Sequence, residues 1–161
     1  MRRRIGWAWA GLVLLATLPA RALPDAEHAA YAVIVSPNVP VSNVTLADAT
    51  RLLLGERRFW QSGLPVVVLL PAVGSPERRF LLEHLFHMSE QGYRRHMLEL
   101  LYRGELDYAP KVVDSRDELF EFTAASPGVV SIVPASESIP STVHVLRIDG
   151  RAAGSPGYAL Q

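Results

Sequence analysis

The residues whose types and spacing suggest chemistry stand in one short run, from Gly74 to Arg78, between an apolar segment and an amphipathic one. Ser75 precedes Pro76, and Ser is a favoured helix N-cap while Pro suits the first helical turn. A helix N-terminus carries a partial positive charge and N–H groups without helical partners, which together bind small anions. We therefore expect an oxyanion site whose backbone amides, just past Gly74, are open to solvent. The residues assigned to it are Gly74, Ser75, Glu77 and Arg78.

Each residue of this run also has an ordinary structural interpretation. A helix cap explains Ser75 fully. The carboxylate of Glu77 opposes an incoming anion, although it interacts favourably with the positive end of a helix. Arg78 and Arg79 lie near Ser75 and would compensate for that charge. The alternative for both arginines is a solvated helix face, which the charge pattern favours.

Two earlier polar side chains belong to the same hypothesis. Ser36 and Asn38 follow the β-branched segment Tyr31–Val35, which predicts a strand. In parallel sheets ligands bind beyond the carboxyl ends of the strands, and the loops after Val35, Leu70 and Val113 meet that description. Ser36 and Asn38 are therefore further candidates for ligand contacts. Their alternative, which residue type favours, is that both simply shape a turn.

The sequence assigns no catalytic residue, no metal and no cofactor. Ser75 lacks the Gly-x-Ser-x-Gly context of a nucleophile, and no His–acid pair has a readable relation to it. His84 and His87 are three apart on one predicted helix, but they lack a His-Glu-x-x-His motif. An ordinary surface pair is the favoured interpretation. Trp60 is interpreted as a core residue rather than a stacking platform.

The first 22 residues predict a cleavable signal peptide. Three arginines, Arg2 to Arg4, precede a short apolar stretch that ends at Pro19, and a small-residue cleavage site follows at Ala20 to Ala22. The apolar stretch is short for a membrane span, although a retained anchor is the alternative. We therefore expect export, with the periplasm as the location.

The remaining 139 residues suffice for one domain with a hydrophobic core. Residues 1–22 hold four of the 16 basic side chains and none of the 16 acidic ones, so the rest of the chain has a formal net charge of −4. This charge argues against a nucleic-acid partner, which selects a basic surface. The chain has no Cys, so neither disulfides nor thiol chemistry is expected.

Strands alternate with amphipathic helices along the rest of the chain. This pattern predicts an α/β fold, a three-layer sandwich with a mostly parallel sheet of about five strands. A lead-in covers 23–30, the domain 31–150, and a flexible tail 151–161. The hydroxyls of Thr45, Ser75, Ser89 and Ser115 are expected helix caps. The expected strands are 31–35, 66–70, 111–113, 129–133 and 143–148.

Five segments in this order resemble the phosphate-binding proteins of ABC transporters, and in particular short, single-domain members of that family. They are YAVIVSPNVPV, LLLGERRFW, VVVLLPAVGSPERRFLL, SPGVVSIVP and VHVLRIDG, which together span about Tyr31 to Gly150. The resemblance implies a fold like one lobe of a type II periplasmic binding protein. The family's Gly-Ser-Gly-Thr phosphate turn maps onto Gly74 to Glu77, where only Gly74 and Ser75 match.

The resemblance implies a periplasmic solute-binding role, with phosphate or a similar small oxyanion as the ligand and no enzymatic activity. An ABC permease or another envelope protein is the partner it suggests, and two copies of a single lobe would assemble the cleft that one chain lacks. An alternative function remains open. The same fold would serve as a non-transport adaptor or sensor that has lost ligand binding and contacts a protein partner.

Overall fold

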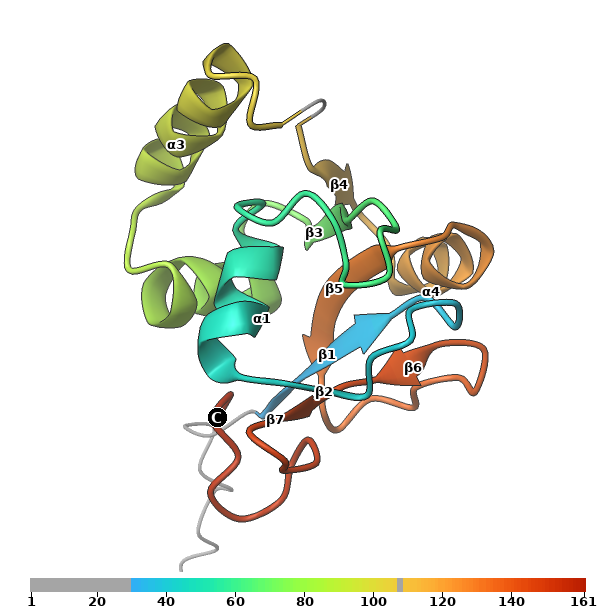
Figure 1. The fold of residues 1–161 in the computed structure, drawn as a ribbon. Coiled ribbons are helices and arrows are strands. Elements are labelled where there is room, and N and C mark those ends of the chain that lie inside the picture. The colour runs from blue at the N-terminus through green and yellow to red at the C-terminus, as the bar shows by residue number, and fades with distance from the viewer. Residues whose placement is uncertain (1–29, 107–108) are drawn as a thin grey trace, which may run out of the picture.

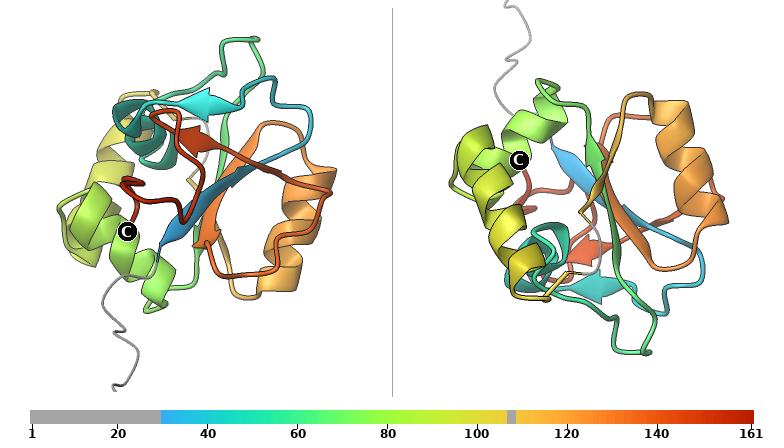
Figure 2. Two further views of the ribbon diagram at one scale, coloured as in Figure 1. Left: turned by 90° about the horizontal axis from the view of Figure 1, so that it is seen from below. Right: turned by 90° about the horizontal axis from the view of Figure 1, so that it is seen from above.

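The computed structural model describes residues 30–106 and 109–161, and there a β-sheet lies between two layers of helices (Figure 1). Helix α4 covers one face and the remaining helices cover the other, as both views of Figure 2 show. The α/β sandwich expected from the sequence is confirmed. The helices are α1 (Leu46–Leu53), α2 (Pro76–Phe80), the π-helix η1 (Leu81–Leu85), α3 (Glu90–Tyr102) and α4 (Arg116–Ala125).

The signal peptide predicted for residues 1–22 lies outside the described residues, as does nearly all of the lead-in. No helix within 30–106 or 109–161 has the length and apolar character needed to cross a membrane.

The main sheet has five strands in the order β4-β3-β5-β1-β6. Strand β3 runs parallel to β4 and to β5, whereas β1 runs antiparallel to both β5 and β6. The sheet is therefore mixed, and the expectation of a mostly parallel sheet was wrong for its β1 side. Alternation of strands and helices does not specify the direction in which β1 inserts beside β5. The strands are β1 (Tyr31–Val35), β3 (Val67–Pro71), β4 (Lys111–Val113), β5 (Val129–Pro134) and β6 (His144–Val145).

Hydroxyl side chains begin four of the helices as the sequence predicted. In each case the side chain accepts a hydrogen bond from the backbone N–H three residues later, which satisfies a donor that lacks a helical partner. The four caps are Thr45, Ser75, Ser89 and Ser115. The sequence did not indicate η1, which continues α2 with one wide turn.

The core has two halves, one on each face of the sheet, because successive strand residues point in opposite directions. In β1, Tyr31, Val33 and Val35 pack on the side of α1 to α3, whereas Ala32 and Ile34 pack on the side of α4. Trp60 is buried in the first half, as expected, and its indole N–H donates to the carbonyl of Gly128 at 2.9 Å.

The strand expected over 143–148 is divided at the buried Leu146. Strand β6 precedes it in the main sheet, and β7 (Arg147–Ile148) follows it in a separate two-stranded sheet. The partner of β7 is β2 (Asn43–Val44), which runs parallel to it and which the sequence did not indicate.

The C-terminal residues 151–161 belong to the fold. Leu160 is completely buried, Tyr158 is 2% exposed, and the backbone N–H of Tyr31 donates to the carbonyl of Leu160 at 2.8 Å. The expectation of a flexible tail was therefore wrong. Residues 151–161 are mostly small or turn-forming, which suggested a flexible tail, but Tyr158 and Leu160 among them pack into the core beside β1.

Candidate functional site

The N-terminus of α2 differs from the open site that the sequence suggested. The hydroxyl of Ser75 accepts from the N–H of Arg78 at 3.1 Å, and the carbonyl of Ser75 accepts from the N–H of Arg79 at 3.0 Å. The N–H of Glu77 is bonded to its own carboxylate, and Pro76 has no N–H. The donors of this helix terminus therefore have partners within the protein, and the expectation of solvent-open amides was wrong.

Gly74 lies in the turn before these residues. Its φ of +85° belongs to the left-handed region that favours glycine, and open space surrounds its Cα. The residue fixes the direction in which the chain enters α2.

Glu77 places its carboxylate at the helix terminus. The residue is 7% exposed, and its carboxylate accepts from Nη2 of Arg116 at 2.8 Å. Burial by itself raises the pKa of Glu77, but hydrogen bonds from its own N–H, from Arg116 and from Ser75 lower that pKa by more. The net pKa lies below the ordinary value for Glu. The surroundings of Glu77 therefore stabilise its ionised carboxylate.

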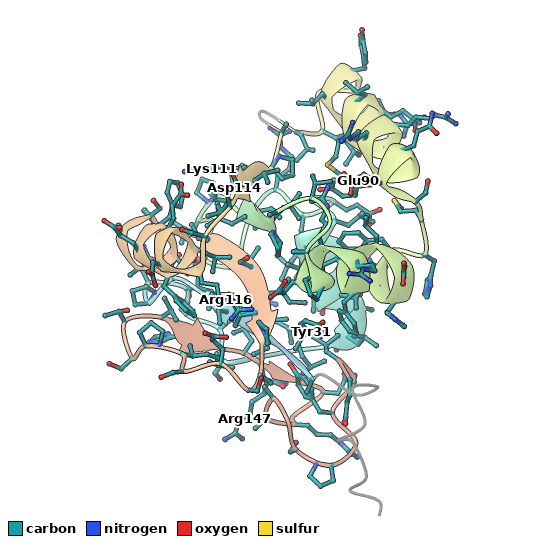
Figure 3. All side chains as sticks on the ribbon, turned by 180° about the vertical axis from the view of Figure 1, so that it is seen from behind. Tyr31, Glu90, Lys111, Asp114, Arg116 and Arg147 are labelled. Atoms are coloured by element: carbon teal, nitrogen blue, oxygen red, sulfur yellow. The ribbon has the colours of Figure 1, made fainter. Side chains whose placement is uncertain are left out.

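Arg116 is the cation of this site, and the sequence reasoning missed it. It is the first residue of α4, directly after the cap Ser115, and it reaches across to α2 (Figure 3). Its guanidinium also donates through Nη1 to Glu137, which follows β5. The Glu77 hydrogen bond, together with both carboxylate charges, raises the pKa of Arg116. One signal in the sequence could have indicated Arg116. A cation in the first turn of a helix interacts unfavourably with the helix dipole, so its presence there suggests a specific partner.

A pocket of about 270 Å³ lies where the N-termini of α2 and α4 approach each other. That volume is several times the ~30 Å³ that one water molecule occupies in the liquid, so it accommodates a small tetrahedral oxyanion. The pocket is at the carboxyl ends of β3 and β4, where the sequence placed the ligand. Its polar lining residues are Ser75, Glu77, Asp114, Ser115 and Arg116.

Arg78 does not reach this pocket. It is 3% exposed, and its guanidinium forms two hydrogen bonds with Glu90 at 2.8 and 3.1 Å. The guanidinium carbon also lies 4.6 Å from the ring centroid of Tyr93, in cation–π geometry. Both sequence interpretations of Arg78, the ligand and the solvated face, are corrected here, because the residue ties α2 to α3. Its neighbour Arg79 is exposed, as the solvated-face interpretation expected.

Ser36 and Asn38 lie at the other end of the sheet, because β1 is antiparallel to β5. The hydroxyl of Ser36 donates to the carbonyl of Ser126 at 2.6 Å and accepts from the N–H of Val129 at 2.7 Å. The Asn38 side chain accepts from the N–H of Gly128. The structure therefore separates both residues from the pocket, and they shape the entry into β5.

The two histidines considered for a metal have other contacts. His84 stacks on Phe80 with ring centroids 5.1 Å apart, and Nδ1 of His87 lies 3.1 Å from the carbonyl oxygen of Glu83. In the part of the chain that the structure describes, no group of three or more His, Cys, Asp or Glu side chains is placed to hold a metal ion.

Comparisons with known proteins support the fold. No family model and no curated protein sequence matches the chain. Among solved structures, the fold resembles a protein from Clostridium perfringens, assigned as a phosphate ABC transporter substrate-binding protein and solved with bound phosphate. The TM-score is 0.61 at 18% identity, over 77% of this chain and 46% of that one.

Two further solved structures give the same result. PstS from Borrelia burgdorferi has a TM-score of 0.59 at 17% identity, over 76% of this chain and 48% of that one. An ABC-type phosphate transport receptor from Vibrio cholerae has a TM-score of 0.60 at 13% identity, again over 76% and 48%. The chain therefore spans about half the length of the structures that it matches, and it has the fold of about half of a PstS-like binding protein.

Proposed function

We propose that the protein is an exported solute-binding module that holds a small oxyanion, phosphate or a close analogue, in the pocket between α2 and α4. One observation carries this proposal. The pocket already stabilises a buried carboxylate, that of Glu77, against Arg116. An environment that lowers the pKa of a buried Glu is favourable for a second anionic oxygen close by, provided that Arg116 is available to it.

The proposal moves the site away from the amides of α2. Arg116 supplies the charge, because a guanidinium binds the oxygens of phosphate or carboxylate through paired N–H donors. Its side chain is 49% exposed, so an anion in the pocket has access to it. The N-terminus of α4 adds a favourable dipole, since this helix has ten residues and begins at Arg116. The likeness to phosphate-binding structures supports phosphate as the first ligand to test.

Phosphate binding is tested by isothermal titration of the purified protein with phosphate and with sulfate, at constant ionic strength. We expect millimolar affinity, because the pocket is open to water and Glu77 opposes the anion. Thermal stability follows the same occupancy: at ten times the dissociation constant, phosphate stabilises the folded state by about 1.4 kcal/mol.

The matched variants are Arg116→Ala and Arg147→Ala. Both remove an exposed arginine, but Arg147 lies in β7, outside the pocket. Loss of phosphate binding in Arg116→Ala alone supports the site. Equal binding by both variants, or absence of binding by the unchanged protein, refutes it.

Export is part of the proposal and has its own test. Expression in a Gram-negative host followed by mass spectrometry of the periplasmic fraction is expected to yield a chain that starts at Leu23. Retention of residues 1–22 on a membrane-bound product contradicts it.

A specific observation favours the second function, a non-transport adaptor that contacts a protein partner. The backbone N–H groups at the start of α2 already have hydrogen-bond partners within the protein, as expected of a site that no longer binds a ligand. Exposed apolar side chains, Phe59 at 52% and Val112 at 43%, would then belong to the partner surface. Absence of any phosphate or sulfate effect in the titrations selects this function over the first.

A further inference from the structure

Arg116 holds two carboxylates that come from different parts of the chain. Nη2 donates to Glu77 of α2, and Nη1 donates to Glu137 of the connection that follows β5. The two partners differ in how firmly they are fixed. The side chain of Glu77 is 9% exposed and that of Glu137 is 29% exposed. Glu77 belongs to a helix, whereas Glu137 belongs to an irregular connection between β5 and β6.

These two contacts leave Arg116 with its terminal nitrogens engaged and with two negative charges for its one positive charge. A small oxyanion that approaches Arg116 meets a net negative group. It also needs paired N–H donors on the guanidinium, and Glu137 occupies one of the two terminal nitrogens. Binding at Arg116 therefore requires that one carboxylate leaves.

We infer that Glu137 is a gate on the pocket: its carboxylate competes with the incoming oxyanion for Arg116 and so sets the affinity of the site. This inference rests on the proposed oxyanion function and names its control element. Glu137 is the partner that leaves, because it is the more exposed of the two and its residue has no helical hydrogen bonds to break. Its backbone stays anchored through its N–H, which donates to the carbonyl of Pro134 at 3.1 Å.

A single substitution tests the gate. Glu137→Gln keeps the size of the side chain and removes its charge, and it leaves Glu77 and Arg116 in place. We expect phosphate to bind roughly fivefold more tightly, the upper range of what a half-exposed ion pair is worth. The matched control is Glu118→Gln. Glu118 is also an exposed acid, but its carboxylate pairs with Lys111 at 3.2 Å, whereas that of Glu137 pairs with Arg116 of the pocket.

The outcomes separate the gate from the function on which it rests. Tighter phosphate binding in Glu137→Gln, with Glu118→Gln within twofold of the unchanged protein, supports the gate. If the unchanged protein binds phosphate and Glu137→Gln changes the affinity by less than twofold, the gate is refuted but the proposed oxyanion site is not. Absence of phosphate binding in both proteins refutes the proposed function itself. Glu137→Asp retains the charge on a shorter arm, and it guards against a result specific to Gln: affinity closer to that of the unchanged protein than to that of Glu137→Gln supports the gate, and affinity as high as that of Glu137→Gln refutes it.

Discussion

Replacing Arg78 by Ala removes a buried cation while its partner, Glu90, stays in place. The structure assigns Arg78 to the attachment of α3, so the variant is expected to lose stability and not ligand binding. The size of the loss follows from the contacts. Two hydrogen bonds join the guanidinium to the Glu90 carboxylate, and the Tyr93 ring packs against it at 4.6 Å.

Removing one member of a buried ion pair costs about 3–5 kcal/mol when the remaining charge is fully desolvated. Glu90 is less confined, because its side chain is 28% exposed and Arg94 lies 3.6 Å away. In addition, Nη1 of Arg78 is buried without a hydrogen-bond partner within the described residues, which lowers the net value of the pair. We therefore expect a cost below that range, about 2–3 kcal/mol including the contact with Tyr93.

The assay is urea unfolding followed by the fluorescence of Trp60, which is buried and is the single Trp beyond residue 22. Arg79→Ala is the matched control, since this neighbouring Arg is exposed and its loss is expected to change the free energy of unfolding by less than about 0.5 kcal/mol. Equal destabilisation by the two variants refutes the reasoning. So does an Arg78→Ala variant of unchanged stability that has lost phosphate binding.

Three further predictions concern the frame around the pocket. Leu160→Ala is expected to lower the free energy of unfolding by about 2–5 kcal/mol, measured by thermal or urea unfolding, because the side chain is completely buried. A loss below about 1 kcal/mol would mean that the C-terminal residues are not part of the core. Gly128→Ala is expected to prevent stable folding, since a Cβ there lies 2.0 Å from the carbonyl oxygen of Pro65, whereas Gly63→Ala, with a similar positive φ but open surroundings, costs only about 1 kcal/mol of backbone strain. Circular dichroism of both Gly variants checks this, and comparable stability contradicts it. The folded protein lowers the pKa of Glu77, so its ionisation stabilises the fold above the ordinary pKa of Glu, and that contribution disappears as the pH falls through the lowered value. Stability measured below pH ~4.5 is therefore expected to fall less steeply in Glu77→Gln than in the unchanged protein.

Local signals in the sequence predicted the local structure well. The four hydroxyl caps, the strands beginning at Tyr31, Lys111 and Val129, and the burial of Trp60 all follow from short-range chemistry. Such signals act within one turn or one strand, so a single sequence suffices to read them.

The remaining features depend on which distant residues meet. The direction of β1 decides that Ser36 lies far from Ser75, and no spacing within the sequence encodes that direction. Arg78 is buried with its guanidinium paired to Glu90, 12 residues later in the chain. Arg116 and Glu77 are 39 residues apart, so their pairing was not visible from either segment alone. Of the side chains that the sequence analysis assigned to the candidate site, Ser75 and Glu77 line the pocket, whereas Arg78, Ser36 and Asn38 do not.

The position of β1 in the sheet has a consequence for the order in which the chain can fold. Its first residue pairs with Pro134, 103 positions later, so β1 has no neighbour on either side until most of the chain is available. Ordering so long an intervening segment is entropically costly, and pairings of this kind form slowly. Under the proposed export, a secretion channel that threads extended polypeptide would receive this chain before its sheet has closed, and folding would be completed only after translocation.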